Sequence, residues 1–284
     1  MSRILVTGSK GFIGRSLVQQ LKLANHSVIE FEGDILDDSS YKKIQSEEID
    51  HCFHLAARSF VPDSWKSPED FIRTNVSGTG KVLEFCRSKN SALTFISSYL
   101  YGAPKYLPID EKHPVQTPNP YALSKHLAEE LCRFYSEHFR LKIAVIRPFN
   151  IYGPGQDERF LIPELILKFE GKNEIVEVKD LAPKRDYVYI SDVVNAIVST
   201  LKLKENWSVL NVGGGYSLSV EEIVTKIKDL SGSSKAIKSS NEVRMNEIPD
   251  TVANIALAFE KMGWKPEVSF EDGIKEILKS KNKK

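Results

Sequence analysis

The stretch that decides the fold is Thr7-Gly8-Ser9-Lys10-Gly11-Phe12-Ile13-Gly14, which directly follows the apolar run Ile4–Val6 and opens a helical pattern at Gly14–Leu23. Its spacing is GxxGxxG, whereas the usual dinucleotide fingerprint is GxGxxG. The glycines nevertheless permit a tight turn and a close backbone approach to a pyrophosphate at a helix N-terminus. The stretch therefore predicts a nucleotide-binding turn, with a purely structural turn as the alternative.

Short apolar runs and helical patterns continue to alternate along the chain. The further apolar runs are Val28–Phe31, Cys52–Ala57, Leu93–Ile96, Ile143–Ile146 and Val209–Val212. Apolar runs without alternating polar residues are typical of strands buried on both faces, and such strands form parallel sheets covered by helices. The helical stretches between them are Ser39–Ser46, Glu69–Ser88, Pro120–His138 and Ser191–Leu203. The sequence therefore predicts an α/β protein with a doubly wound, Rossmann-like parallel sheet.

The alternation is interrupted from Ile151 onward, and this interruption predicts a second region. We expect residues 1–150 to form the nucleotide-binding domain, with return segments near 186–212. Residues 151–185 and 213–284 would then form a smaller, mixed α/β region that binds the substrate. Within that region, the composition of residues 231–240 predicts a loop.

Composition excludes several classes of partner and site. Lys+Arg 39 against Asp+Glu 38 leave a formal net charge of +1, which excludes a bulk electrostatic footprint for nucleic acid. The longest apolar runs are about five residues, whereas a membrane-spanning helix needs ~20. Three separated cysteines without a CxxC pair predict reduced thiols in a cytoplasmic protein. His51 and His54 fall on opposite faces of one strand, so no metal site is expected.

Glu32 lies at the end of the second predicted strand, 24 residues after Gly8. A carboxylate at that position can hold the adenosine ribose diol, and it repels a 2′-phosphate. Glu32 therefore favours NAD over NADP as the cofactor. The alternative is that Glu32 is a solvated strand end.

Tyr121 and Lys125 lie four residues apart at the start of a predicted helix, so both point to the same side. A nearby ammonium stabilises phenolate over phenol and lowers the pKa of the tyrosine from ~10 toward neutrality. Tyr121 is then a candidate acid/base for a sugar or alcohol hydroxyl. Ser97, at the end of the run Leu93–Ile96, can hydrogen-bond the reacting oxygen.

Combined, these motifs resemble those of the extended short-chain dehydrogenases/reductases, in the nucleotide-sugar epimerase/dehydratase family, over nearly the whole chain. TGSKGFIG resembles the family's TGxxGFIG, and SSYLYG at residues 97–102 resembles its SSxxVYG loop. YALSK at residues 121–125 carries the tyrosine and the lysine. RPFNIYGPGQ at residues 147–156 resembles RxFNxYGPxQ, and the segment that begins at Arg244 resembles RPGDxPxT.

The resemblance implies a role for each matching position. The catalytic residues are expected to be Ser97, Tyr121 and Lys125. The residues expected to bind NAD are Gly8, Lys10, Gly11, Phe12, Ile13, Gly14, Glu32, Asp34, Ile35, Leu55, Ala56, Ala57, Asn75, Tyr121, Lys125 and Pro148. The residues expected to bind a nucleotide-diphosphate sugar are Ser98, Asn150, Arg185 and Arg244. Either arginine could instead be an ordinary surface residue, and Asn150 could simply cap its loop.

The resemblance also implies a homodimer, in which the helices Glu69–Ser88 and Pro120–His138 of each subunit pair across the interface. Packing of these helices within one chain is the alternative. The sequence departs from the family pattern after the second strand, where VIEFEGDILDD leaves almost no connecting loop. We therefore leave the strand count near residues 28–36 open, and expect Asp34 and Ile35 to lie against the adenine.

The first hypothesis for function is a nucleotide-sugar 4-epimerase with retained NAD, in which Tyr121 takes the C4 hydroxyl proton and a 4-keto intermediate turns over. The alternative is an NAD(P)H-dependent reductase of a nucleotide 4-keto-6-deoxy sugar, since SFVPDSW at residues 59–65 resembles such enzymes. A dinucleotide-sensing protein without catalysis is a third reading, against which the intact triad argues. The family's 4,6-dehydratases carry Asp-Glu after the catalytic hydroxyl, whereas this chain has Ser98 and Tyr99.

Overall fold

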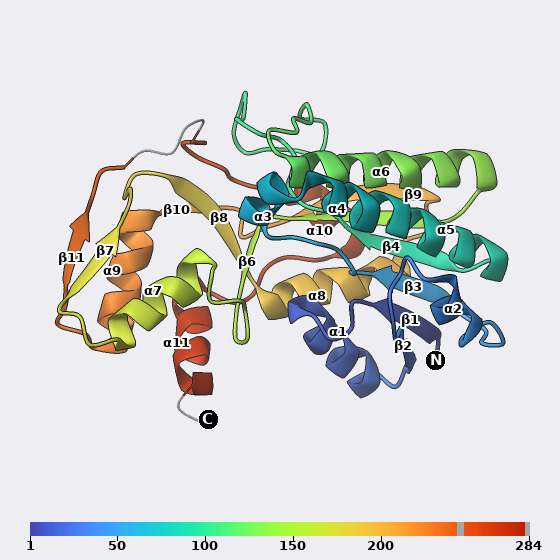
Figure 1. Ribbon diagram of the computed structural model, residues 1–284, viewed down its shortest axis with the longest axis horizontal. Helices are drawn as coiled ribbons and strands as arrows, with labels where there is room; N and C mark the ends of the chain where they lie inside the picture. The colour runs from blue at the N-terminus through green and yellow to red at the C-terminus, as the bar shows by residue number, and fades with distance from the viewer. Residues whose placement is uncertain (243–246, 282–284) are drawn as a thin grey trace.

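A six-stranded parallel sheet forms the centre of the computed structural model, which describes residues 1–242 and 247–281 (Figure 1). The strands are β1 (Arg3–Thr7), β2 (Ser27–Glu30), β3 (His51–His54), β4 (Ala92–Ile96), β5 (Ile143–Pro148) and β9 (Trp207–Val212). Their order is β2-β1-β3-β4-β5-β9, and every neighbouring pair is parallel. The predicted α/β fold with a doubly wound parallel sheet is confirmed.

Helices cover both faces of this sheet, because alternate residues of each strand point to opposite sides. In β1, Ile4 and Val6 pack into a core with α1 (Phe12–Leu23) and α8 (Ile190–Ser199). Leu5 points to the other side, into a core with α5 (Gly78–Lys89) and α6 (Pro120–Phe139). Figure 1 shows α5 and α6 side by side on one face and α1 and α8 on the other.

A smaller region lies beside the sheet, at the left of Figure 1. Its three-stranded sheet has the order β10-β8-β6, and its two-stranded sheet pairs β11 with β7. The elements are β6 (Asn150–Tyr152), α7 (Leu161–Glu170), β7 (Ile175–Val178), β8 (Lys184–Tyr189), β10 (Ser217–Ser219), α9 (Val220–Ser231), β11 (Ala236–Ser239) and α11 (Phe270–Lys281). Tyr152, Ile223 and Phe270 lie in the separate hydrophobic core of this region.

Three elements differ from the sequence expectations. The stretch predicted to be a loop at 231–240 contains β11, which pairs with β7 in a register that no local pattern reveals. Helix α9 was not expected, although its capping box Ser219-x-x-Glu222 is visible in the sequence. The single helix expected at Glu69–Ser88 is divided into α4 (Pro68–Ile72), a π-helical turn at Arg73–Ser77, and α5.

The strand β2 forms one edge of the sheet. The strand count near residues 28–36, which the sequence left open, is therefore one. The chain passes from β2 through Gly33, at φ +112°, directly into α2 (Asp38–Lys42). The other short helices of the sheet region are α3 (Val61–Lys66) and α10 (Ala256–Met262). Within the described ranges, no helix is both long and apolar enough to cross a membrane.

Candidate active site

The glycine-rich turn joins β1 to α1 at the carboxyl edge of the sheet. Gly8 has φ +69°, and a Cβ there would lie 2.7 Å from the backbone N of Ala56. A Cβ on Gly14 would lie 2.1 Å from the carbonyl O of Gly8. No side chain caps the N-terminus of α1, and its first turn carries no acidic residue. This backbone cradle fits a pyrophosphate, as expected from the sequence.

The segment that follows β3 forms the wall opposite the turn. The backbone N of Ala56 donates to Thr7 Oγ1 at 3.2 Å, so the two chain segments are fastened together. His54 shares hydrogen bonds with Thr7 Oγ1 at 2.7 Å and with Thr79 Oγ1 at 3.0 Å. Burial lowers the pKa of His54 to about 3, so the ring is neutral and structural. No His, Cys, Asp and Glu side chains of the described ranges group to hold a metal ion.

Two acids stand near the end of β2. Glu32 is exposed beyond the strand, in the region expected to face the ribose. Glu30 accepts a hydrogen bond from Lys22 Nζ at 2.9 Å, and this bond lowers the pKa of Glu30, with a smaller lowering by the Ser9 side chain of the glycine turn. Sequence reasoning missed Glu30, although side chains two apart on a strand share a face.

The next two predicted contacts differ in exposure. Asp34 is exposed, and its Oδ1 accepts a hydrogen bond from the backbone N of Leu36 at 2.9 Å. Ile35 is buried beneath α5, where a Cβ on Gly78 would lie 2.5 Å from its Cδ1. The Ile35 side chain therefore packs into the protein core.

Tyr121 lies at the start of α6, and its hydroxyl forms a hydrogen bond with the Ser98 side chain. The Ser97 hydroxyl is buried and has no hydrogen-bond partner. The hydroxyl that contacts the phenol is therefore that of Ser98, and the catalytic role expected of Ser97 stays a prediction. Ser98 lies between two backbone hydrogen bonds to β5, from Ser97 N to Ile146 O at 2.8 Å and from Tyr99 N to Pro148 O at 3.2 Å.

The lysine of the pair lies deeper than the tyrosine. Lys125 Nζ donates to the Ile96 carbonyl O at 2.5 Å and lies 4.2 Å from the Phe95 ring centroid. Burial lowers the pKa of Lys125 to about 8, and the Glu129 carboxylate opposes this shift.

The pKa of Tyr121 does not follow the sequence expectation. Burial raises it to about 12, and the Ser98 hydrogen bond lowers it by a smaller amount. The Lys125 ammonium, which donates to the Ile96 carbonyl O, does not contribute to the shift of the Tyr121 pKa in the described structure.

Asn75 joins the segment that follows β3 to the helix that carries Tyr121. It lies in the π-helical turn, accepts a hydrogen bond from Arg58 N at 2.8 Å, and donates to Arg58 O at 3.0 Å. Its amide also donates to Ser124 Oγ at 2.9 Å. These bonds hold the start of α6 in place.

The substrate side of the site contains Asn150 and Arg185. Asn150 accepts a hydrogen bond from the Tyr99 hydroxyl at 3.2 Å and donates to Asp186 O at 2.8 Å. Arg185 donates to Ile248 O at 2.5 Å and forms an ion pair with Glu247. Arg185 is therefore half-buried with its own carboxylate partner, which the sequence did not reveal.

Two further predicted residues complete the assignment. The Pro148 carbonyl O, at the end of β5, accepts a hydrogen bond from Tyr99 N at 3.2 Å. Arg244 lies outside the described residues.

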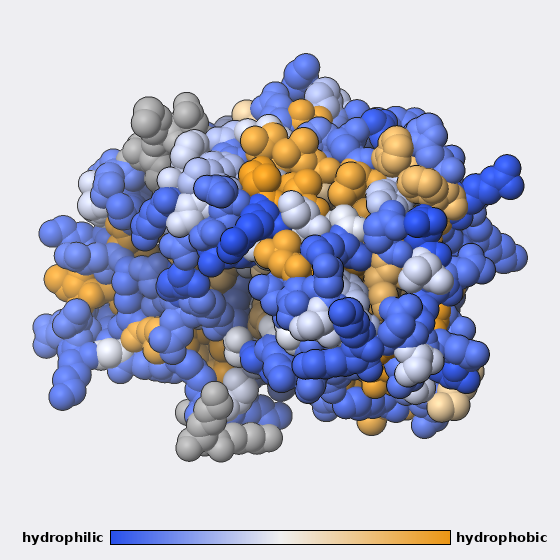
Figure 2. Space-filling model, turned by 45° about the vertical axis from the view of Figure 1, so that its right-hand side comes forward, coloured by the Kyte–Doolittle hydropathy of each residue, from blue (hydrophilic) through white to orange (hydrophobic). Residues whose placement is uncertain are grey.

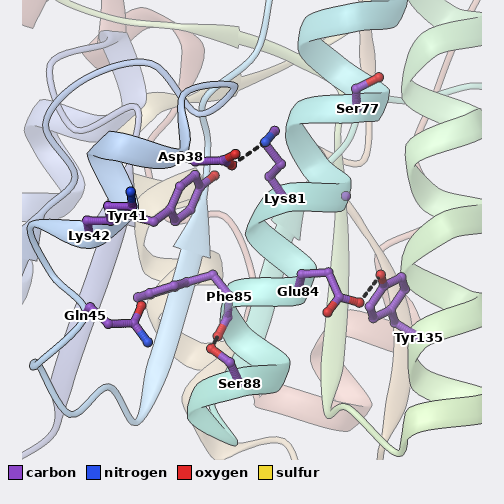
Figure 3. A pocket seen from close by; sticks show the side chains of 11 residues that line it. Asp38, Tyr41, Lys42, Gln45, Ser77, Lys81, Glu84, Phe85, Ser88 and Tyr135 are labelled. Carbon is purple, nitrogen blue, oxygen red and sulfur yellow. Dashed lines mark hydrogen bonds and ion pairs between the residues drawn. The ribbon is translucent and has the colours of Figure 1, made fainter.

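A hollow of about 590 Å³ lies elsewhere, between α2, α5 and Tyr135 of α6 (Figure 3). Lys81 pairs with Asp38 across it, and the Tyr135 hydroxyl donates to Glu84 at 2.5 Å. None of the predicted site residues lines this hollow, so its position does not alter the location of the candidate site.

The chain is similar to known proteins over nearly its whole length. A model of the "NAD dependent epimerase/dehydratase family" matches residues 4–213. A "Putative UDP-glucose 4-epimerase" of Methanocaldococcus jannaschii is 33% identical over 97% of each chain. The solved UDP-glucose 4-epimerase of Thermotoga maritima with UDP-glucose is 27% identical, covers 99% of each chain, and superposes with a TM-score of 0.93. The solved RMD of Pseudomonas aeruginosa, complexed with NADPH, is 28% identical over 98% of each chain, with a TM-score of 0.92.

Proposed function

Since the chain belongs to the NAD dependent epimerase/dehydratase family, a family of sugar-nucleotide enzymes that use NAD, we propose that it is a nucleotide-sugar 4-epimerase with permanently bound NAD. One observation carries the proposal: the Tyr121 phenol contacts the Ser98 hydroxyl, with Lys125 one helical turn away on the carbonyl of Ile96, at the carboxyl edge of a sheet whose first turn is a glycine cradle. The similarity to a putative UDP-glucose 4-epimerase over almost the whole chain supports it.

The residues on the NAD side fit the cofactor. The turn from Gly8 to Gly14 would hold the pyrophosphate, Glu32 the adenosine ribose, and Lys125 the nicotinamide ribose. The segment Leu55–Ala57 and Pro148 would line the dinucleotide on either side. Bound NAD supplies reversible hydride transfer at C4 of the sugar.

Tyr121 would handle the proton of the sugar O4 oxygen. Its pKa of about 12, raised by burial, means that the phenol keeps its proton at neutral pH, so it is a donor to that oxygen. A cation placed beside the phenol would lower the pKa of Tyr121. Tyr121 could then also accept the proton from the O4 hydroxyl of the sugar. Ser98 takes the role expected for Ser97, because its hydroxyl reaches the phenol and can hydrogen-bond the same sugar oxygen.

The residues after the serine pair argue against dehydration. Elimination of water at C5 and C6 needs an acid and a base directly after the catalytic hydroxyl in this family's pattern. Ser98 as the hydroxyl puts Tyr99 and Leu100 at those positions, and Ser97 as the hydroxyl puts Ser98 and Tyr99 there. Neither assignment supplies a carboxylate.

The substrate proposed is a nucleotide-diphosphate sugar. Asn150, Arg185 and Arg244 would contact it, with guanidinium groups on the diphosphate oxygens. Arg185 must exchange its contact with Glu247 for the phosphate in that case. Three free, buried cysteines and a soluble substrate class are consistent with a cytoplasmic location.

A reductase of a nucleotide 4-keto-6-deoxy sugar is the second candidate. It is favoured by the likeness to the P. aeruginosa RMD structure, which holds NADPH, the usual cofactor of reductions. The same three side chains would serve it, acting once per turnover and with an exchangeable cofactor.

We further propose a homodimer formed through α5 and α6. Leu123, Leu127 and Phe134 follow one face of α6 at spacings of four and seven, and each is at least 40% exposed. Figure 2 shows hydrophobic side chains gathered at the top of the molecule, the part where α6 lies in Figure 1. A contiguous apolar face of this kind is typical of a protein–protein interface.

The test of the proposed function uses the purified protein without added cofactor. Mass spectrometry of the denatured protein should find one NAD per chain, and NMR should show inversion at C4 of one nucleotide sugar from a panel of UDP-, GDP-, dTDP- and CDP-hexoses. A protein that is free of dinucleotide, leaves every hexose unchanged and consumes NADPH with a 4-keto sugar would instead be the reductase.

A further inference from the structure

A buried ion pair lies one helical turn beyond Lys125. Glu129 accepts three hydrogen bonds from Arg147 of β5: two from Nε, at 3.0 and 3.2 Å, and one from Nη2 at 2.5 Å. Lys125, Glu129 and Arg147 are 3%, 3% and 6% exposed. A positive, a negative and a second positive group therefore lie together where water cannot screen them.

The guanidinium of Arg147 is fixed independently of Glu129. Its Nη1 donates to the Tyr101 hydroxyl at 3.0 Å, and its Cζ lies 5.2 Å from the Tyr101 ring centroid. The Tyr101 hydroxyl in turn donates to Asn211 Oδ1 at 2.6 Å. Arg147 therefore holds the Glu129 carboxylate in one place.

Lys125 and Glu129 share the inner face of α6, because residues four apart on a helix are neighbours. The other titratable groups facing Lys125 are Tyr121 and Cys132 of α6 and His54 of β3. Burial raises the pKa of the Cys132 thiol and lowers that of His54 to about 3, so both are neutral near pH 7. Glu129 is the anion that the described residues place beside the ammonium.

We propose that Glu129 is a positioning residue that keeps Lys125 in its ammonium form, and that Arg147 both fixes the Glu129 carboxylate and limits its effect on the lysine. The link to activity rests on the proposed function, in which the Lys125 ammonium assists Tyr121. The link between the three buried groups does not depend on that function.

Charge removal at the two ends of the ion pair then has opposite effects on Lys125. Glu129→Gln leaves Arg147 and Lys125 as two buried cations, so the lysine loses its proton more readily. Arg147→Met leaves Glu129 with Lys125 as its neighbouring cation, so the lysine holds its proton more tightly. A residue with a merely structural role would not produce opposite shifts.

The experiment measures the pKa of Lys125 directly, by NMR of the NAD-containing protein labelled with [¹³C]lysine. The Cε resonance that disappears in Lys125→Met identifies the residue. The wild-type resonance should titrate near pH 8, apart from surface lysines near ~10.4. Glu129→Gln should lower this midpoint by about one pH unit, so that the ammonium fraction at pH 8 falls from about one half to about one tenth. Arg147→Met should raise the midpoint.

Two further variants keep the test decisive if a single variant does not fold. Glu129→Asp keeps the charge and should keep the midpoint close to wild type. The double variant Glu129→Gln/Arg147→Met removes both charges of the ion pair, so neither Glu129 nor Arg147 is left as an unpaired buried charge, and its midpoint should lie between those of the single variants. Midpoints that stay unchanged, or that move in the same direction in both single variants, would overturn the proposal.

The pH–rate profile separates this inference from the proposed function. The alkaline limb of kcat should follow the NMR midpoint downward in Glu129→Gln and upward in Arg147→Met. If the NMR midpoints move as expected while the rate profiles do not, the coupling of the three buried groups holds and the role given to Lys125 in catalysis fails.

Discussion

The two neighbouring serines give opposite expectations, and alanine substitutions can separate them. Ser98 hydrogen-bonds to Tyr121, whereas the Ser97 hydroxyl is buried without a partner. Ser98→Ala removes a hydrogen bond to a group that carries charge during proton transfer. Such bonds contribute about 1.5–3 kcal/mol, which corresponds to a fall in kcat of about 10- to 200-fold.

Ser97→Ala should have a different signature. A buried hydroxyl that forms no hydrogen bond carries its desolvation cost of about 1–3 kcal/mol without compensation. Its removal should leave kcat within a few-fold of wild type and raise the unfolding temperature, by about 2–4 °C for each kcal/mol in a chain of this size. The substituted side chain is smaller by one oxygen atom only.

The assay is steady-state epimerisation of the nucleotide sugar identified by NMR, together with thermal unfolding of each variant. The NAD content of both variants, measured after denaturation, controls for loss of the cofactor. If Ser97→Ala loses the rate and Ser98→Ala keeps it, the hydroxyl at the sugar oxygen is Ser97. The geometry described here would then not be that of the working site.

Four other predictions rest on single features. Tyr121→Phe should keep the fold and the bound NAD but lose roughly 10²–10⁴-fold in kcat, and activity within a few-fold of wild type would refute the assignment of the proton to this phenol. Glu32→Gln should improve NADP binding relative to NAD by about tenfold, or ~1.4 kcal/mol, in titrations of apo protein; an unchanged ratio would place the discriminating charge elsewhere, for instance on Glu30. Leu127→Asp should convert the proposed dimer to a monomer in sedimentation velocity, and a wild-type monomer would contradict the assembly. His51 and His54 have pKa values lowered by burial to about 3, so the unfolded chain binds more protons below ~6.5 and stability should decline as the pH falls. Between pH 7.5 and 5 that decline is roughly 2 kcal/mol per histidine, and equal urea midpoints at the two pH values would argue against it.

Most of the parallel sheet could be predicted because its strands are buried on both faces and their apolar runs are unbroken. The strand β11 could not, since Ala236–Ser239 alternates exposed and half-buried residues and is defined by its pairing with β7. The helix α9 was not expected, although its capping box Ser219-x-x-Glu222 is visible in the sequence.

The candidate site shows the same division between local and long-range information. Gly14 could be assigned because the atoms that exclude a Cβ there belong to Gly8 and Ser9 of the turn itself, whereas the close contact of Gly8 with Ala56 is long-range. The contact of Ser98 with Tyr121 joins the chain after β4 to α6, and such a long-range contact is not visible in the sequence. The motif SSYLYG therefore predicts Ser97 as the catalytic hydroxyl, whereas the hydroxyl in contact with the phenol is that of Ser98.

The buried ion pair Glu129–Arg147 also depends on a long-range contact, between α6 and β5. The helical spacing of Tyr121, Lys125 and Glu129 is visible in the sequence, and so is Arg147 at the head of the RPFN motif. No local sequence pattern indicates that Arg147 of β5 lies beneath α6. Without that arginine, Glu129 would be interpreted as an ordinary acidic residue on the helix surface. Once the fold buries all three charges, the lysine is no longer a fixed cation with the pKa of a free side chain. Its protonation becomes a balance between burial and one carboxylate, and in the proposed function the chemistry at Tyr121 depends on that balance.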